Sequence, residues 1–199
     1  LKNCVLDILP NGKIEIIKHS YLNMNFYCLP YSYDAKAKCN EFQKFLDSSL
    51  PDKDLQMILQ EFIGWCLLHD NTKETKFEKA LFLYGKGSNG KSVLYEIVCS
   101  LFGRENVSMF QLADLTTNAN SRASAKNALV NFCSDIERNG KIEHGTLKAM
   151  ISGEAVQFKL MRQDVTTEDW KPKLIFNANN MPNHAEFTDA FFRRLIVIP

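Results

Sequence analysis

The sequence predicts an α/β fold in which a mostly parallel, five-stranded sheet is covered by helices. Two observations lead to this prediction. From residue 80 onward, short apolar runs suited to buried strands alternate with segments of helical periodicity. A glycine-rich segment over 85–92 joins the first of these strands to a helix. With 45% hydrophobic and 24% charged residues, the 199 residues have the composition of a globular protein with one substantial core.

The first 72 residues are expected to form a small α+β region, and residues 73–199 the main domain. An Asn-Gly pair between two apolar segments predicts a β-hairpin over 5–17. Apolar residues at helical spacing predict a short helix over 36–47. A Pro-Asp pair then opens a longer helix over 51–68.

The main domain is expected to begin with a strand of continuous apolar character, as in a strand buried on both faces. The helix after it should end at Gly103, which stands where a C-cap glycine belongs. The predicted strands are 80–84, 106–110, 128–133, 173–178 and 195–198. The predicted helices are one through 94–101, whose apolar residues repeat at helical spacing, and one over 145–151.

The glycine-rich segment has the pattern G-x-x-x-x-G-K-[ST], the phosphate-binding P-loop. Its glycines let successive backbone N–H groups converge on phosphate oxygens, and the helix that follows favours anions at its N-terminus. Lys91 adds a charge toward the outer phosphates, and the Ser92 hydroxyl can bind Mg²⁺. The sequence therefore predicts a site for ATP and Mg²⁺. The residues expected to hold the nucleotide are Gly85, Lys86, Gly87, Ser88, Asn89, Gly90, Lys91 and Ser92.

Two acids follow another apolar run, over 129–133. Hydrolysis of a nucleoside triphosphate needs a carboxylate at the end of a neighbouring strand for the Mg²⁺ shell, and a group that orients or deprotonates water. We assign Asp135 to the metal and Glu137 to the water. The alternative is that both acids are solvated loop residues.

The strand predicted over 173–178 leads into amide side chains. Asn179 can hydrogen-bond the γ-phosphate or the attacking water, and Asn177 and Asn180 compete for that role. The alternative is that these residues only build a turn, which asparagine favours.

Arg193 and Arg194 precede the last strand. An arginine can stabilise charge on a transferred phosphoryl group, as an arginine finger from a neighbouring subunit does. The alternative is a pair of surface cations, and the residues themselves do not separate the two.

These segments, in this order, resemble the superfamily 3 helicases of the AAA+ class. The greatest resemblance is to the phage and plasmid primase–helicase family, which also occurs in poxviruses and other large DNA viruses. The resemblance covers nearly the whole chain. It rests on the order in which all these segments occur, because the P-loop alone is common to NTPases in general. The segments that carry it are 85–92, 134–137, 147–154, 179–182 and 191–195, preceded by 29–34 and 64–67.

The resemblance implies a homo-hexameric ring that hydrolyses ATP between subunits and translocates on single-stranded or forked DNA. Asn179 would be the sensor, and Arg193 or Arg194 would act on a neighbour's nucleotide. A hairpin within 155–170 would reach the DNA, with Lys159 and Arg162 on its phosphates; the alternative is a solvated hairpin face.

The same resemblance implies a primase domain on the same polypeptide, a core truncated at its C-terminus, and a cytoplasmic location in a bacterial cell or in a host of a phage, plasmid or virus. One difference from the family pattern leaves open which acid is the catalytic base. Family members often end the acidic strand in adjacent acids, whereas here Ser134 precedes Asp135 and the second acid is Glu137.

Composition and charge bear on membrane insertion, on DNA binding and on the state of the cysteines. No apolar run has the length of a membrane span, and the net charge of +1 argues only weakly against DNA, since a ring can concentrate charge in its channel. Six cysteines without metal or redox spacing predict buried, reduced thiols. Besides the helicase motor, two functions stay open: a small-molecule or nucleotide kinase, and an ATP-gated assembly platform.

Overall fold

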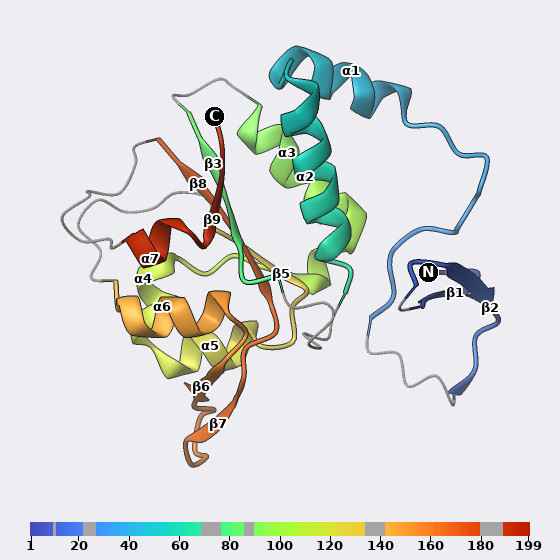
Figure 1. The fold of residues 1–199 in the computed structure, drawn as a ribbon. Helices are drawn as coiled ribbons and strands as arrows, with labels where there is room; N and C mark the ends of the chain where they lie inside the picture. The colour runs from blue at the N-terminus through green and yellow to red at the C-terminus, as the bar shows by residue number, and fades with distance from the viewer. Residues whose placement is uncertain (10, 22–26, 69–76, 86–89, 134–141, 180–188) are drawn as a thin grey trace.

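The computed structural model describes most of the chain (Figure 1). The described stretches are residues 1–9, 11–21, 27–68, 77–85, 90–133, 142–179 and 189–199.

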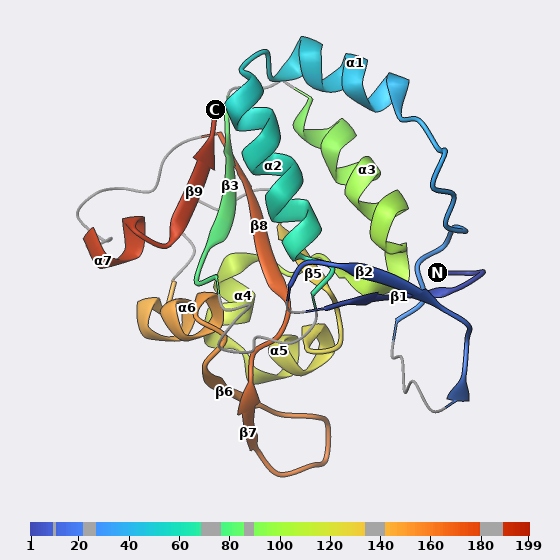
Figure 2. The same ribbon diagram turned by 45° about the vertical axis from the view of Figure 1, so that its right-hand side comes forward.

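Five parallel strands form the central sheet of the described residues, in the order β4-β5-β8-β3-β9. The predicted α/β fold with a five-stranded parallel sheet is therefore confirmed. Since the strands are parallel, their carboxyl ends point to one edge, which is the upper edge in Figures 1 and 2. The strands are β3 (Ala80–Tyr84), β4 (Val107–Ser108), β5 (Val130–Cys133), β8 (Lys173–Ala178) and β9 (Leu195–Ile198).

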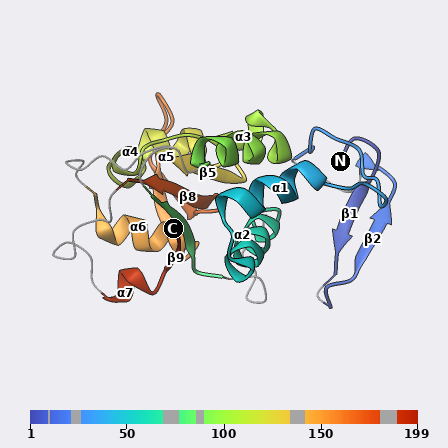
Figure 3. The same ribbon diagram turned by 90° about the horizontal axis from the view of Figure 1, so that it is seen from above.

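Helices cover both faces of this sheet, as Figure 3 shows from above. Apolar residues of α1, α2 and α3 form one buried cluster with one face of the sheet. Residues of α4, α5, α6 and α7 form a second cluster with the other face. The helices are α1 (Asn40–Ser49), α2 (Lys53–Trp65), α3 (Lys91–Phe102), α4 (Leu112–Thr117), α5 (Ala119–Ala125), α6 (His144–Ile151) and α7 (Asp189–Phe192).

The predicted helices lie where the sequence indicates, with shifted ends. The first begins at Asn40, four residues later than expected, and α2 ends at Trp65, three residues before 68. The start of α2 is fixed by Asp52, whose side chain accepts hydrogen bonds from the backbone N–H groups of Asp54 and Leu55. The predicted C-cap at Gly103 is confirmed, with φ +85°.

The helices α4 and α5 were not predicted from the sequence. Each spans fewer than two turns and is rich in Thr, Ser and Asn, which favour caps and turns over helix interiors. Such short helices depend on tertiary packing, here through fully buried Leu115 and Ala125.

A polar cluster around Asp47 joins α1 to α2. Its carboxylate accepts hydrogen bonds from Lys53, Gln56 (3.0 Å) and Gln43 (2.9 Å). These bonds, led by that from Lys53, lower the pKa of Asp47 to about 2. Gln56 is buried and also donates to the backbone oxygen of Leu50 at 2.8 Å. The cluster therefore holds α1 at a fixed angle on α2, close to the start of α3.

The N-terminal hairpin is confirmed, with β1 (Val5–Ile8) antiparallel to β2 (Ile14–Ile17). Gly12 adopts φ +78° in its turn, as the Asn-Gly pair requires. The predicted boundary between residues 72 and 73 lies outside the described residues. Phe62 of α2, in the predicted N-terminal region, belongs to the same buried cluster as Leu81 of β3, in the predicted main domain.

All six cysteines are free, and the predicted burial is correct for four of them and wrong for two. Burial raises the pKa of the Cys66 thiol. Cys4, Cys66, Cys99 and Cys133 are buried, whereas Cys28 and Cys39 are exposed.

A second hairpin projects from the lower end of the molecule in Figures 1 and 2. It consists of β6 (Ala155–Phe158) paired with β7 (Thr166–Asp169), within the range that the sequence predicts. Phe158 stacks on buried Trp170 with ring centroids 6.2 Å apart. The base of the hairpin is thus part of the core, while its tip is exposed.

Arg122 of α5 fastens this hairpin to the helices. Its guanidinium is buried and donates to the backbone oxygens of Gln157 (2.6 Å), Leu115 (2.8 Å) and Thr116 (3.2 Å). One side chain therefore satisfies carbonyl groups of β6 and α4 that would otherwise be buried without a donor.

We expect Arg122→Met to lower the free energy of unfolding by about 3 kcal/mol, because two buried carbonyls and one partly buried carbonyl lose their donor. Urea unfolding measures the change. The matched control is Arg104→Met, which removes a guanidinium that is 66% exposed and paired with Glu96, and should cost less than about 0.5 kcal/mol. Equal effects of the two substitutions would contradict the anchoring role.

Candidate phosphate-binding site

The ends of β3 and β8 are aligned at the upper edge of the sheet. Their register pairs Leu83 with Asn177 and Tyr84 with Ala178. The ladder continues one step further, since the backbone N–H of Gly85 donates to the oxygen of Ala178 at 3.1 Å. The first glycine of the P-loop is therefore fixed against the strand that carries the candidate sensor amides.

Gly90 is the last glycine of the P-loop and the N-cap residue of α3. Its φ of +84° is left-handed, and its oxygen accepts the first helical hydrogen bond, from Leu94 at 2.9 Å. A Cβ atom here would lie 2.9 Å from Ser49 Oγ and 3.1 Å from a ring carbon of Phe45. Both the backbone angle and the space left by α1 thus require glycine. Lys86, Gly87, Ser88 and Asn89 lie outside the described residues.

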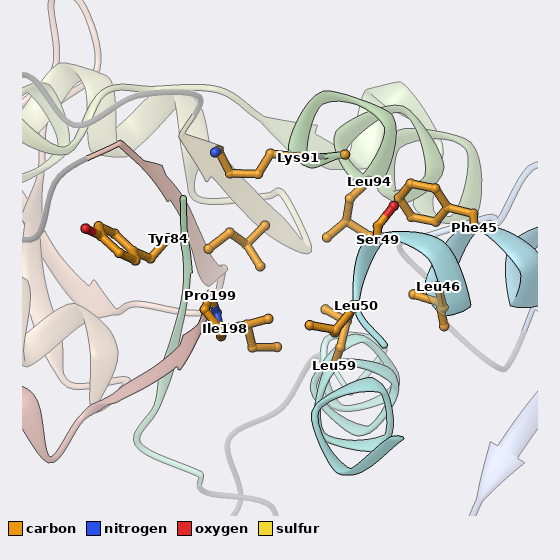
Figure 4. Close-up of a pocket in the computed structure, with 12 residues that line it drawn as sticks. Phe45, Leu46, Ser49, Leu50, Leu59, Tyr84, Lys91, Leu94, Ile198 and Pro199 are labelled. Carbon is orange, nitrogen blue, oxygen red and sulfur yellow. The ribbon is translucent and has the colours of Figure 1, made fainter. Parts of the chain in front are cut away.

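Lys91 and Ser92 open α3 just above the sheet edge. The Lys91 ammonium donates to the backbone oxygen of Gly85, and its side chain is half-buried. Figure 4 shows this side chain extending away from Ser49 and Phe45, toward the strands. The Ser92 side chain is exposed at the second position of the helix. The ammonium therefore joins the start of α3 to the first glycine of the P-loop.

A small apolar cavity lies beside this site, between α1 and the sheet edge (Figure 4). Its volume is about 40 Å³, room for about three water molecules. Ligand pockets usually measure roughly 300–1,000 Å³, so the cavity reflects the close approach of α1. Its lining includes Phe45, Leu50, Leu59, Leu94 and Ile198.

The acidic strand is placed differently from the prediction. We expected the strand before Asp135 to neighbour the P-loop strand, but β8 lies between β5 and β3. Two strand spacings amount to roughly 10 Å. Asp135 and Glu137 themselves lie outside the described residues, and the described part of β5 ends at Cys133, in register with Phe176. The arrangement was missed because β8 follows β5 in sequence and enters the sheet between the earlier strands.

Among the described residues, no group of three or more His, Cys, Asp or Glu side chains could hold a metal ion. Of the two predicted metal ligands, Ser92 is among the described residues, whereas Asp135 lies outside them.

The amides of β8 differ sharply in their surroundings. Asn179 follows the strand end and is exposed, whereas Asn177 is buried within the sheet at 6% exposure. The side-chain oxygen of Asn177 has no hydrogen-bond partner among the described residues. Asn180 lies outside them. The three candidates are therefore not equivalent, although the sequence could not rank them.

Arg193 and Arg194 lie at the opposite end of the sheet from the P-loop. The backbone oxygen of Arg194 accepts from Ala80 at 2.8 Å, at the start of β3. Five residues of strand separate that point from Gly85, roughly 16 Å. The Arg194 side chain contacts Ser152 (3.2 Å) and Glu78 (3.9 Å). The structure therefore does not bring either arginine to the P-loop of its own chain.

Lys159 and Arg162 lie in the connection between β6 and β7. Figure 2 shows that this hairpin projects from the end of the molecule opposite helix α1 and the start of helix α2. Both residues are exposed. Arg162 adopts φ +61° in a turn closed by a hydrogen bond from Gln163 N to Leu160 O at 3.2 Å. Non-glycine residues seldom take this backbone angle, so the turn fixes Arg162 at the hairpin tip at some cost in strain.

None of the described helices is long and apolar enough to cross a membrane.

Solved structures with the same fold include the C-terminal region of NrS-1. Its apo structure of residues 305–718 has a TM-score of 0.61 and 21% identity, over 82% of this chain and 38% of that one. An A form apo structure of that region has a TM-score of 0.59 and 20% identity, and the match covers 94% of this chain and 43% of that one. A compound-bound JCV helicase has a TM-score of 0.49 and 16% identity, over 77% and 42%.

The chain thus spans less than half the length of the NrS-1 structures that it matches, and that likeness establishes the fold. No curated protein matches the sequence. A family model, described as a family of unknown function, matches residues 83–194, from the end of β3 through the two arginines. The chain therefore belongs to the DUF5906 family.

Proposed function

We propose that this chain is the motor module of an ATP-dependent DNA helicase, part of a phage- or plasmid-type replication protein. The observation that carries the proposal is the junction at the upper sheet edge. There the backbone N–H of Gly85 donates to the Ala178 oxygen at the end of β8, Gly90 turns the chain into α3, and the Lys91 ammonium donates to the Gly85 oxygen. A buried strand, a glycine turn and a helix N-terminus in this order form the setting that a bound triphosphate requires.

ATP would be held by the backbone N–H groups of residues 85–92 and by the Lys91 ammonium. Ser92 and Asp135 would hold Mg²⁺, which, when bound, neutralises charge on the β- and γ-phosphates. Lys91 would leave the oxygen of Gly85 for a phosphate oxygen, exchanging a neutral acceptor for a charged one. A hydroxyl and a carboxylate are ligands that Mg²⁺ favours, so the proposed residues fit the ion.

In the proposed reaction a water oxygen forms a bond to the γ-phosphorus, and the bond from that phosphorus to the β,γ-bridging oxygen breaks. The products are ADP and inorganic phosphate, and the proton that the water loses passes to Glu137 and then to solvent. Asn179, exposed just beyond the end of β8, would orient the γ-phosphate or that water. Asn179 is one strand away from Gly85, which suits this role.

The two arginines are proposed to act between subunits. Because they lie at the far end of the sheet from their own P-loop, a phosphoryl group could meet one only on a neighbouring copy. Arg193 is exposed, whereas Arg194 is partly buried and bound to Ser152 and Glu78. We therefore assign the finger to Arg193 and a structural role to Arg194. We therefore propose a homo-hexamer in the full-length protein. The primase domain on the same polypeptide is proposed from the sequence resemblance alone.

The hairpin of β6 and β7 is proposed to contact single-stranded or forked DNA. Its base is anchored by Arg122, while Lys159 and Arg162 are exposed toward its tip. Two cations on a rigid projection suit contacts with phosphates, which a moving motor must make without regard to sequence. A kinase has no evident use for such a hairpin, so this feature favours the motor.

Lys91→Ala is expected to abolish ATP turnover, because the loss of the ammonium leaves the charge of the outer phosphates uncompensated. Phosphate release by the full-length protein, with and without single-stranded DNA, measures it. The wild type should release free phosphate faster when DNA is present. Arg104→Ala serves as an exposed control with wild-type turnover. Undiminished turnover in Lys91→Ala, or transfer of the phosphoryl group to a small molecule, would contradict the motor.

Replacing Lys159 and Arg162 together by alanine is expected to weaken binding of single-stranded DNA. The slope of log affinity against log salt concentration should fall by about 1.4, the value for two phosphate contacts. Fluorescence anisotropy at several salt concentrations measures this slope. The control, Lys13→Ala with Arg104→Ala, changes net charge equally on other exposed parts of the molecule. An identical salt dependence in both double variants would rule out the hairpin.

Arg193→Ala is expected to lower turnover about 10³-fold, the effect of losing an arginine finger, while leaving ATP affinity nearly unchanged. Mixing it with Lys91→Ala protomers should restore part of the activity, because some interfaces then pair an intact P-loop with an intact Arg193. A steady-state ATPase assay of the mixture measures this rescue. A mixture as inactive as its components would show that Arg193 does not act across subunits.

A further inference from the structure

Asn177 differs from the other buried side-chain amides that the structure describes, because its oxygen has no hydrogen-bond partner. Its neighbours in β8 are apolar, and its side-chain oxygen is the one buried side-chain nitrogen or oxygen without a hydrogen-bond partner in the described part of the chain. An acceptor removed from water without a donor destabilises the fold, and native proteins seldom tolerate it. Such an atom calls for an explanation.

The sheet contains a second buried asparagine, Asn131, whose side-chain oxygen and nitrogen both have hydrogen-bond partners. The side-chain oxygen of Asn131 accepts from Ser108 Oγ and Phe110 N, both at 2.9 Å, and its amide nitrogen donates to Phe110 O at 3.0 Å. Gln56 and Asn106 likewise bond backbone oxygens, both at 2.8 Å. The fold therefore provides partners for its structural amides, and the amide of Asn177 does not follow that rule.

The position of Asn177 links it to the phosphate-binding site. It is in register with Leu83, two residues before Gly85, so it lies roughly 7 Å below the P-loop along the sheet. Residues in register on adjacent parallel strands share a face. Leu83 packs in the cluster that includes Leu94 of α3, so the Asn177 side chain lies on the face that α3 covers. Lys91 begins that helix.

The chemistry of the unpaired atom restricts what can approach it. A carboxamide oxygen only accepts hydrogen bonds, and phosphate oxygens only accept them too, so the two do not pair. A donor that arrives together with a magnesium-bound triphosphate is a water molecule of the metal's shell, because Mg²⁺ keeps several waters when it binds.

We propose that the side-chain oxygen of Asn177 accepts a hydrogen bond from a water molecule that enters with the magnesium–nucleotide complex. Asn177 is then a positioning residue beneath the site, separate from the exposed Asn179 that we assign to the γ-phosphate. This inference rests on the proposed nucleotide site. It explains why the sheet carries a buried acceptor that no described residue satisfies.

The test compares Asn177→Leu with Asn131→Leu, two substitutions of the same kind in the same sheet. Without ligand, Asn177→Leu should keep or raise the Tm, since it removes an unpaired acceptor, whereas Asn131→Leu should lower it. With Mg²⁺, Asn177→Leu should weaken binding of a non-hydrolysable ATP analogue about five-fold, the loss of one hydrogen bond. In EDTA, its affinity should equal that of the wild type.

Three results would overturn the proposal: a Tm loss in Asn177→Leu as large as in Asn131→Leu, an unchanged affinity with Mg²⁺, or an equal loss of affinity with and without Mg²⁺. If Asn177→Leu does not fold, Asn177→Ala replaces it, with the same expected dependence on Mg²⁺. Failure of the proposed function is distinguishable, because the wild-type protein would then not bind the analogue at all.

Discussion

The parallel pairing of β3 with β8 is the constraint on which the rest of the site depends. It continues past the last strand residue to the hydrogen bond between Gly85 N and Ala178 O, so the loop after β3 starts from a fixed point. The same register sets the depth of Asn177 below the loop and places Asn179 beside it. A slip of one residue would exchange the two faces of β8 and move both amides away. The sheet therefore positions the residues of the proposed phosphate site.

The two ends of the sheet carry different parts of the proposed machinery. The upper end holds the P-loop and the amides, while the lower end holds Arg193 and the projecting hairpin (Figure 1). Within one chain these parts are a strand length apart, so neither can act on the other. In the ring that we propose, the lower end of one subunit would meet the nucleotide of the next. Ser49 and Phe45 of α1 occupy the space that a side chain at Gly90 would need, so α1 lies close to the end of the loop.

Local signals in the sequence were sufficient for most of the fold. The continuous apolar run of β3, the Asp52 cap and the positive φ at Gly90 and Gly103 each follow from a few adjacent residues. The sequence could not show that β8 lies between β3 and β5, because strand order depends on contacts between distant segments. It also missed α4 and α5, whose short polar sequences are held helical by tertiary packing. The lack of space for a side chain at Gly90, next to Ser49, and the unpaired oxygen of Asn177 likewise appear only once separate elements are assembled.

The central claim is that the carboxyl edge of β3 and β8 holds a magnesium-bound triphosphate. Its most direct test is an experimental structure of the protein with Mg²⁺ and a non-hydrolysable ATP analogue. We expect the phosphates on the backbone of residues 85–92, the Lys91 ammonium moved from the Gly85 oxygen to a phosphate oxygen, and a water within hydrogen-bond reach of Asn177. A nucleotide bound elsewhere, with Lys91 still on Gly85, would contradict it.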